Sequence, residues 1–217
     1  MAVFSCSKPL DYSSVKVIEV IDGDTIRLEN GKLLRYIGLD TPELRDKKNG
    51  NFVFNPQPYS QEAAQYNRGL VEGKNIRVEF DLVQMDKYKR LLGYCFLGDI
   101  FINAKLLEEG LAALYTCPPN VKYSQLFVKN QREARQNKKG IWSGHEVVSA
   151  DKAYQYIGQI RCVRGRVLAT YQSKKCVYLN FGSNYKEDFT VVIFNDALEQ
   201  FRTKGIDPCT FYKDKLI

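Results

Sequence analysis

The 217-residue sequence predicts a mainly β fold of the α+β class, with a barrel-like domain followed by a smaller domain of similar type. Short apolar runs bounded by Gly, Asn and Asp recur through the first 100 residues and are typical of strands. Longer runs with helical periodicity stand between and after them, and a second series of short apolar runs begins after Trp142. Five strands with three helices inserted or appended indicate an OB-fold, the five-stranded Greek-key barrel.

The first three strands are predicted over residues 15–20, 25–28 and 33–39. Residues 15–20 alternate in polarity and lead into the turn Asp22-Gly23. Asn30-Gly31 separates the second strand from the third, and both of its residues tolerate the positive φ of a type I′ turn. The sequence therefore predicts a hairpin that brings the ends of these strands together.

The rest of the first domain is predicted to mix helices and strands. Residues 44–58, which include Pro56 and Pro58, are expected to form a long polar loop. Ser60 is expected to cap the following helix, and a glycine is expected to end each helix. The predicted elements are a helix over 60–72 ended by Gly73, strands over 76–80 and 91–97, a helix over 104–109 between Asn103 and Gly110, and a helix over 123–138 ended by Gly140, with Leu126, Phe127, Asn130 and Ala134 on one stripe.

Residues 146–217 are expected to form the second, OB-like domain, after an N-terminal arm of residues 1–14 and a barrel domain of residues 15–145. Three and a half strands do not close a barrel, so this domain is predicted to be truncated, with a strand edge open to pairing. Its predicted elements are strands over 160–170 (bent at Gly165), 177–181 and 189–194, a helix over 197–201, and the start of a fourth strand over 213–217.

Scarce residue types exclude several kinds of chemistry. The single histidine, His145, excludes zinc sites built from paired histidines, and there is no nucleophile elbow of a serine hydrolase. The six cysteines form no Cys-x-x-Cys pair, so a zinc knuckle is not expected, and Cys95, Cys162 and Cys176 are expected to be buried. No apolar run is long enough to span a membrane. Catalysis is therefore expected to depend on carboxylates, arginines or a bound ion.

The formal net charge of +7 is distributed unevenly. Basic and acidic side chains balance over the first 100 residues, whereas residues 152–186 contain Lys, Arg and aromatic residues but no Asp or Glu. Cations interleaved with aromatic rings are what binding of single-stranded nucleic acid requires. The alternatives are a solvated basic face over core aromatics, or a protein-binding surface. The candidate nucleic-acid-binding residues of this segment are Arg164, Arg166, Lys174 and Lys175.

A small group of polar residues lies at the ends of the first predicted strands. The predicted hairpin places Asp24 and Asp40 at neighbouring strand ends, where two carboxylates can bind a hard cation. The alternative is that both are solvated loop acids. The whole group consists of Asp24, Arg35, Asp40, Thr41 and Glu43, with Arg90 at the start of a later strand.

The order of the motifs around these residues resembles the staphylococcal (thermonuclease) nuclease family. The resemblance covers residues 15–143 and implies a five-stranded OB barrel with three helices. It also implies calcium-dependent hydrolysis of DNA and RNA, with 5′-hydroxyl and 3′-phosphate products. Each motif alone is modest, but the combination is specific. The motifs are residues 20–25 (VIDGDT), Arg35, residues 40–43 (DTPE), residues 86–91 (DKYKRL) and residues 140–143 (GIWS).

The resemblance implies a metal site and a water-activating group. Asp24 and Asp40 match the family's calcium-binding carboxylates, and Thr41 matches the position that offers a main-chain carbonyl. Glu43 matches the residue that activates or orients the attacking water. With only three protein ligands, water and a substrate phosphate are expected to complete the coordination of Ca²⁺.

The resemblance also implies contacts with nucleic acid, expected to be single-stranded DNA or RNA. Arg35 and Arg90 match the two arginines that bind the scissile phosphate. Arginine suits this task because its planar fork binds two oxygens and stays charged at any working pH. Further nucleic-acid contacts are expected from Lys87, Tyr88 and Tyr115.

Two departures from the family pattern bear on these expectations. Lys89 stands where the family commonly has glycine, so a turn that needs positive φ there would strain or displace Arg90. Residues 44–59 also differ, so substrate preference does not carry over. The alternative function is a catalytically silent nucleic-acid-binding or scaffold protein of the same fold. The resemblance favours an exported or cell-envelope protein, although no signal-peptide core precedes Cys6.

Overall fold

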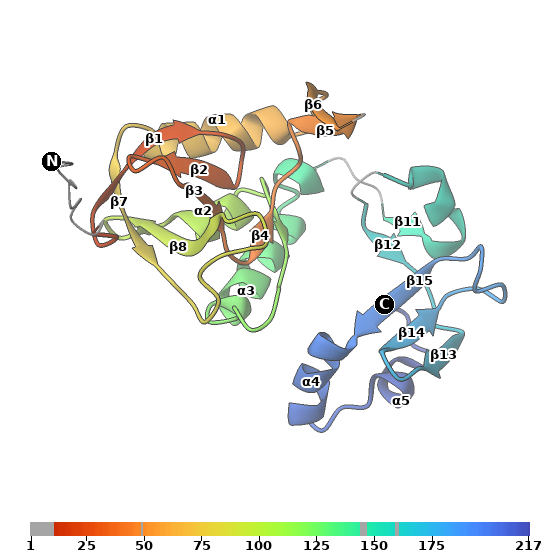
Figure 1. Cartoon of the computed structure of the whole chain (residues 1–217). Helices are drawn as coiled ribbons and strands as arrows, with labels where there is room; N and C mark the ends of the chain where they lie inside the picture. Colours follow the sequence, from red (N-terminus) through yellow and green to blue (C-terminus); the bar gives the residue numbers. More distant parts are fainter. Residues whose placement is uncertain (1–10, 49, 144–146, 159–160) are drawn as a thin grey trace, which may run out of the picture. The chain divides into compact units, whose positions relative to one another are not determined.

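The computed structural model describes residues 11–48, 50–143, 147–158 and 161–217 (Figure 1). The chain forms two compact units, Met1–Ser143 and Gly144–Ile217, here called the barrel unit and the C-terminal unit. None of the described helices is long and apolar enough to cross a membrane. The assignment of residues 1–14 to an arm and of residues 146–217 to an OB-like domain stays a prediction, and residues 1–10 lie outside the described part.

The barrel unit is built on a closed sheet. Its strands have the order β3-β2-β1-β7-β8-β9, and a parallel pairing of β3 with β8 closes five of them into a barrel. The closed five-stranded barrel confirms the OB-fold predicted for this part of the chain. The strands are β1 (Val15–Val20), β2 (Thr25–Leu28), β3 (Leu33–Tyr36), β7 (Asn75–Glu79), β8 (Leu91–Leu97) and β9 (Ile100–Phe101).

The described part of this unit has three α-helices, as predicted: α1 (Ser60–Val71), α2 (Ile102–Glu108) and α3 (Ser124–Gln136). Helix α2 contacts β8 and α3, and α1 contacts β1. The Phe127 ring on α3 packs against Gly38, where φ is +88° and an added Cβ would lie 2.4 Å from the ring. This contact explains why the strand predicted over 33–39 is divided into β3 and β4 (Leu39–Asp40), which pairs with β10 (Ala113–Leu114).

The polar loop predicted over residues 44–58 is wrong. The segment contains a hairpin of β5 (Arg45–Lys48) and β6 (Asn51–Phe54), and Gly50 in its turn has φ +84°. Phe52 and Phe54 alternate over too few positions to indicate a strand by periodicity, and both are exposed, so no core burial signals them either.

Smaller predictions for the barrel unit also need correction. Asn30-Gly31 does form a hairpin, but only Gly31 has positive φ, so the turn is not type I′; Leu28 N–H bonds to the Lys32 carbonyl across a three-residue loop. Ser60 is the first residue of α1 and its hydroxyl bonds to the Gln57 carbonyl, while Tyr59 is the N-cap. Leu126 is exposed, and the buried stripe of α3 is Phe127, Asn130 and Ala134.

The C-terminal unit contains a three-stranded antiparallel sheet that α4 and α5 contact. Its small core is formed by Val167, Val177, Leu179 and Leu198. A separate parallel pair, β11 and β12, and two 3₁₀ segments complete the described structure after α3. After α3, the barrel unit ends with η1 (Gly140–Trp142). The elements of the C-terminal unit are β11 (Val148–Ser149), η2 (Ala150–Tyr156), β12 (Val163–Arg164), β13 (Ala169–Gln172), β14 (Cys176–Asn180), β15 (Thr190–Phe194), α4 (Asn195–Thr203) and α5 (Pro208–Tyr212).

The predicted strand over 160–170 is wrong in its extent, because the described residues of this range belong to two short strands, β12 and β13, and the segment between them. Residue 160 lies outside the described part of the chain. The last residues pair with the segment between those strands: Ile217 and Gly165 exchange two backbone hydrogen bonds of 3.0 Å. The sequence did not predict α5. Cys95 and Cys176 are buried as expected, whereas Cys162 is only half-buried, and all described cysteines are free.

Candidate active site

The hairpin of β2 and β3 brings an arginine between two carboxylates. Thr25 is opposite Arg35 in the register, so Asp24 lies beside Arg35 at the end of the hairpin. The Arg35 Nη1 atom donates to Asp24 Oδ1 at 2.7 Å, and its Nη2 atom donates to Asp40 Oδ1. One guanidinium therefore joins the two acids that sequence reasoning placed at neighbouring strand ends.

A close contact fixes the Asp24 turn against the segment after β4. Asp22 Oδ1 accepts hydrogen bonds from the backbone N–H groups of Asp24 (3.0 Å) and Thr25 (2.7 Å). The backbone N–H of Thr41 donates to Asp24 Oδ2 at 3.2 Å. An added Cβ at Gly23 would lie 2.7 Å from the Thr41 side chain, so glycine permits this approach.

The environment of Asp24 is unusual for a carboxyl group. Burial raises the pKa of Asp24 to about 7, and the nearby Asp22 carboxylate adds to this effect. Arg35 and the hydrogen bonds from Thr25 and Thr41 act in the opposite direction. A cation placed next to this carboxylate would therefore offset the free-energy cost of keeping a buried carboxyl group ionised.

Arg90 is held by a tight turn at the start of β8. Asp86 Oδ1 accepts from the backbone N–H groups of Tyr88 (2.9 Å) and Arg90 (3.0 Å), and Asp86 Oδ2 accepts from Arg90 Nε at 2.8 Å. Lys89 has φ +64°, so this turn does need the left-handed conformation that the family's glycine would supply. Lysine adopts it, and Arg90 stays bonded within the turn.

The barrel closure places Arg35 and Arg90 on one face of the sheet. Arg35 is opposite Leu92 in the parallel β3–β8 register, and Arg90 precedes Leu92 by two residues. Arg90 lies one residue before β8, and the alternation of side chains along the strand, continued to this residue, puts it on the side of Leu92 and Arg35. Sequence reasoning named both arginines, but their shared face depends on this nonlocal pairing.

Glu43 lies within the same electrostatic environment. Partial loss of solvent raises the pKa of Glu43, and the carboxylates of Asp22 and Asp40 add to it, while Arg35 and Arg90 lower it. Its main chain is fixed by Gln57, whose side-chain oxygen accepts from the Glu43 N–H and whose N–H donates to the Glu43 carbonyl, both at 2.9 Å. Sequence reasoning missed Gln57, because a glutamine in a polar segment carries no signal of this contact.

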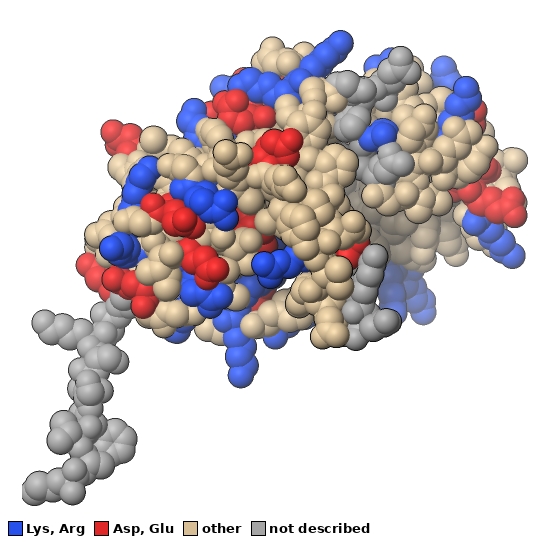
Figure 2. All heavy atoms as spheres, turned by 90° about the horizontal axis from the view of Figure 1, so that it is seen from above, with Lys and Arg blue, Asp and Glu red and all other residues tan. Residues whose placement is uncertain are grey.

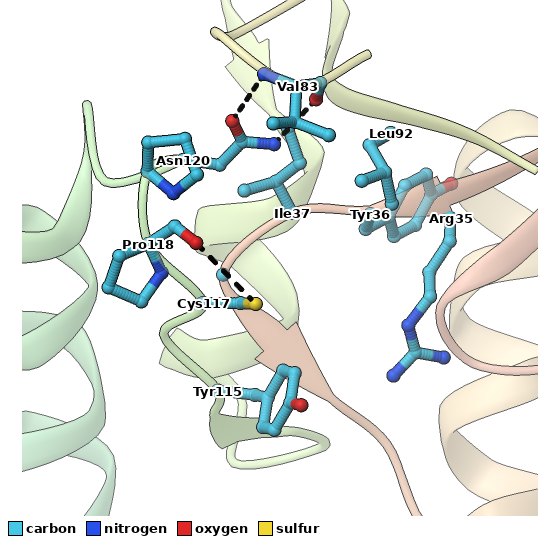
Figure 3. Close-up of a pocket in the computed structure, with 11 residues that line it drawn as sticks. Arg35, Tyr36, Ile37, Val83, Leu92, Tyr115, Cys117, Pro118 and Asn120 are labelled. Carbon is cyan, nitrogen blue, oxygen red and sulfur yellow. Dashed lines mark hydrogen bonds between the residues drawn. The ribbon is translucent and has the colours of Figure 1, made fainter. Parts of the chain in front are cut away.

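A small cavity of about 110 Å³, open to solvent, lies beside Arg35. Asn120 fixes its upper wall by bonding to the N–H (2.8 Å) and the carbonyl (2.7 Å) of Val83. In Figure 3 the Arg35 guanidinium and the Tyr115 ring lie in the lower part of the view, below Val83 and Asn120. The lining residues are Arg35, Tyr36, Ile37, Gly38, Val83, Leu92, Tyr115, Cys117, Pro118, Pro119 and Asn120.

The remaining predicted contact residues are on the surface. Lys87 and Tyr88 are exposed, and the Lys87 Nζ and Arg90 Cζ atoms lie 5.0 and 5.6 Å from the centre of the Tyr88 ring. In the C-terminal unit Arg164, Lys174 and Lys175 are exposed. Arg166 is also exposed, but its Nη1 atom donates to the Asp214 carbonyl at 2.6 Å.

The residues present fit a hard cation, although the described part of the chain holds no group of three or more His, Cys, Asp or Glu side chains suited to a metal. The candidate donors are instead two carboxylates, Asp24 and Asp40, which converge on one guanidinium, and the Thr41 main chain beside them. Carboxylate and carbonyl oxygens are the ligands that Ca²⁺ prefers.

A closed OB barrel with carboxylates and arginines at one edge is what the resemblance to the staphylococcal nuclease family predicts. Comparison with known proteins identifies the same family. A family model described as "Staphylococcal nuclease homologue" matches residues 33–144. The Thermonuclease of Staphylococcus hyicus is 42% identical over 131 residues, which are 59% of this chain and 75% of that protein. The Thermonuclease of Staphylococcus intermedius is 39% identical over 132 residues, 59% of this chain and 76% of that protein. Endonuclease YncB of Bacillus subtilis is 40% identical over 135 residues, 60% of this chain and 62% of that protein.

The chain belongs to the staphylococcal nuclease family. The resemblance stated from the motifs is therefore confirmed, as is the expectation of a nuclease, an enzyme that hydrolyses phosphodiester bonds. The family match ends at residue 144 and leaves the C-terminal unit unmatched.

Proposed function

We propose that this nuclease is calcium-dependent, hydrolyses both DNA and RNA, and leaves a 5′-hydroxyl and a 3′-phosphate. The observation that carries the proposal is the Asp24–Arg35–Asp40 cluster, in which one guanidinium contacts two carboxylates at the barrel edge. Arg90 on the same sheet face and the Glu43 carboxylate among these charges support it. Together these groups suit the binding of a phosphate and the activation of water.

In this proposal Asp24 and Asp40 hold Ca²⁺ through their carboxylate oxygens, and the Thr41 carbonyl is a third ligand. When bound, the ion supplies positive charge that stabilises the negative charge developing at phosphorus. Since Ca²⁺ takes about 6–8 oxygens, water and the substrate phosphate complete its coordination. The cation also offsets the cost of burying the Asp24 carboxylate.

Arg35 and Arg90 bind the oxygens of the scissile phosphate. A phosphodiester anion repels an incoming hydroxide, and two guanidiniums offset that repulsion as a fifth oxygen joins phosphorus. Each arginine is already oriented by a carboxylate, Arg35 by Asp24 and Arg90 by Asp86. Such preorganised donors need little rearrangement when the substrate binds.

Glu43 accepts the proton of the attacking water on a carboxylate oxygen. As the new P–O bond forms, the P–O5′ bond breaks, and the departing 5′ oxygen takes up a proton from solvent, which leaves a 5′-hydroxyl and a 3′-phosphate. The two hydrogen bonds between Gln57 and the Glu43 main chain fix the backbone from which this side chain extends. The chain's single histidine, His145, lies outside the described residues and the motif cluster, so a carboxylate is the base that the described site offers.

The cavity beside Arg35 binds the base next to the scissile phosphate, with Tyr115 stacking on it. Lys87 adds phosphate attraction at the exposed turn before Arg90, and Tyr88 forms the surface beside it. Figure 2 shows acidic and basic side chains intermixed over the face in view, without one large field of a single sign.

The C-terminal unit holds single-stranded DNA or RNA and raises its concentration near the barrel unit. Its exposed cations Arg164, Lys174 and Lys175 support this, as does the exposed Tyr171 ring, whose centre lies 6.0 Å from that of Tyr178. A second candidate, that this unit binds protein, predicts binding that does not depend on these cations.

Cleavage of single-stranded DNA in Ca²⁺ and in chelator tests the proposal. The wild-type chain is expected to cleave with Ca²⁺ and to lose activity in chelator, and Glu43→Ala is expected to lower kcat by orders of magnitude at unchanged DNA binding. Glu29→Ala, the same change at an exposed glutamate in the β2–β3 loop, at the other end of the hairpin from Asp24 and Arg35, is the matched control. Activity that persists in chelator, or survives Glu43→Ala unchanged, would eliminate this mechanism and favour the silent binding protein or another catalytic route.

A further inference from the structure

The hairpin of β5 and β6 exposes aromatic rings to solvent immediately after the candidate catalytic glutamate (Figure 1, orange). The side chains of Phe52 and Phe54 are 71% and 63% exposed. Among the described residues, the principal contacts of each strand are with the other strand of the hairpin. An exposed apolar surface of this kind, flanked by charge, is typical of a binding site.

The register divides the hairpin into two chemically different faces. Arg45 is opposite Phe54, and Phe52 follows on the same side of β6, so one face presents a cation with two aromatic rings. Val53 is opposite Asp46 on the other face, where Asp46 Oδ2 accepts from Asn55 Nδ2 at 2.6 Å. Arg45 is exposed and has no carboxylate partner within the described part of the chain.

The base of the hairpin is continuous with the candidate active site. Beyond the hairpin strands, the Asn55 N–H donates to the Leu44 carbonyl at 3.1 Å. One step farther from the turn, Glu43 and Gln57 are joined by the two hydrogen bonds described above. Glu43 and the aromatic face are therefore parts of one hydrogen-bonded segment. The aromatic face is therefore within one short segment of the position at which we propose that the scissile phosphate binds.

We propose that Arg45, Phe52 and Phe54 form a binding platform for unpaired nucleotides next to the scissile phosphate, and so select single-stranded over duplex nucleic acid. The inference rests on the proposed nuclease function and names its substrate class. The two rings stack on bases, which are free to do so only when unpaired, and the Arg45 guanidinium contacts a phosphate. Nucleic acid is favoured as the occupant because the platform continues from a site built for a phosphodiester and carries a cation opposite one ring.

Binding and cleavage by the full chain test the platform separately. In chelator, where no cleavage is expected, the Phe52→Ala/Phe54→Ala variant is expected to bind a fluorescent single-stranded oligonucleotide about tenfold more weakly or worse, by anisotropy. In Ca²⁺, its KM for the same oligonucleotide is expected to rise by a similar factor. Its turnover of a nitrophenyl thymidine phosphodiester, which is too small to reach the hairpin, is expected to be unchanged.

Two variants separate stacking from structural damage. Val53→Ala removes apolar surface from the opposite face of the same strand and is expected to behave as wild type. Phe52→Tyr/Phe54→Tyr keeps the rings and is expected to retain binding. Duplex of the same sequence is expected to bind the wild type and the alanine variant equally.

The outcomes distinguish this inference from the nuclease proposal. Equal losses on the oligonucleotide and the small ester would show that the hairpin only positions Glu43, and would overturn the platform. Unchanged oligonucleotide binding together with loss of binding to anionic vesicles would assign the rings to a membrane surface and also overturn it. A wild type that cleaves nothing, but whose oligonucleotide binding depends on both rings, would refute the nuclease mechanism and support the platform.

Discussion

The two units of this chain bury their apolar residues to very different extents. The barrel unit closes five strands around a large apolar cluster that includes Tyr36, Tyr94 and Phe127. The C-terminal unit has an open three-stranded sheet and a core of four buried side chains. This difference agrees with the division of tasks that we propose, because catalytic groups need a rigid frame and an adaptable binding surface does not.

The open sheet shows what the smaller core leaves uncovered. Val177 and Leu179 of β14 point into the core, so the alternate residues of the same sheet form its other face. The register puts Tyr171 beside Tyr178 on that other face, and Phe194 beside Cys176. Tyr171 and Phe194 are exposed, so this face combines rings with the cations of the β13–β14 turn.

Removing the shared guanidinium of the barrel unit is expected to have the largest effect. Arg35→Ala leaves Asp24 and Asp40 without their common partner. It also removes the guanidinium that we propose donates hydrogen bonds to the scissile phosphate. We expect kcat/KM on single-stranded DNA and on a small phosphodiester to fall by about 10²–10³. Steady-state kinetics on both substrates measures this.

Arg35→Lys sharpens the test, because it keeps the charge and loses the fork. A deficit close to that of Arg35→Ala is expected. If the small phosphodiester is hydrolysed at the wild-type rate by either variant, the chemistry does not take place at this cluster.

A smaller loss is expected from Gly23→Ala, which affects only the spacing within the site. The new methyl group would lie 2.7 Å from the Thr41 side chain and force the Asp24 turn away from it. Overpacking of this kind costs roughly 1–3 kcal/mol. We expect the barrel unit to lose about that much stability and activity to fall by about tenfold, measured by thermal unfolding and kinetics.

Gly31→Ala is the control for this variant. Its added Cβ meets nothing within 4 Å, so strain at φ +79° is its only cost. Equal activity of both variants would contradict the spacing argument.

Sequence reasoning succeeded where function depends on local geometry. The alternation in residues 15–20 predicted β1, and the Asn30-Gly31 turn predicted the hairpin that sets Asp24 beside Arg35. The features that sequence reasoning missed either depend on contacts between distant segments or bury no side chains that would reveal them by periodicity. The β3–β8 pairing that aligns Arg90 with Arg35, and the Phe127 ring that divides a strand at Gly38, join segments far apart in the sequence.

The hairpin after Glu43 was missed for a different reason. Periodicity detects a strand because one of its faces is buried, and the described side chains of β5 and β6 are largely exposed. A surface that serves a ligand instead of the core therefore gives a polar-looking segment with two unexplained rings. Exposed aromatics next to a catalytic motif are the signal that could have located it.

The C-terminal unit is expected to affect binding without affecting chemistry. Lys174→Ala/Lys175→Ala removes two exposed cations at the β13–β14 turn. Because each lost phosphate contact removes counterion release, the slope of log Kd against log salt for single-stranded DNA should flatten by up to about 1.4. Anisotropy titrations at several salt concentrations measure it. Lys204→Ala, an exposed lysine after α4, is the control. An unchanged slope would favour a protein partner for this unit.

The smallest expected effect is a gain of stability confined to the barrel unit. Lys89 has φ +64°, a conformation that costs a residue with a Cβ roughly 1–2 kcal/mol and costs glycine little. Lys89→Gly also makes the unfolded chain more flexible, which returns about 0.4–1 kcal/mol of that gain. The net expectation is a stabilisation of about 0.5–1 kcal/mol, seen by calorimetry as a rise of a few degrees in the unfolding transition of the barrel unit alone.

The activity of Lys89→Gly should equal that of the wild type, because the hydrogen bonds of Asp86, and not the Lys89 side chain, hold Arg90. A lower Tm would show that the turn stabilises lysine in some other way, and a single transition that rises for the whole chain would show that the two units unfold as one.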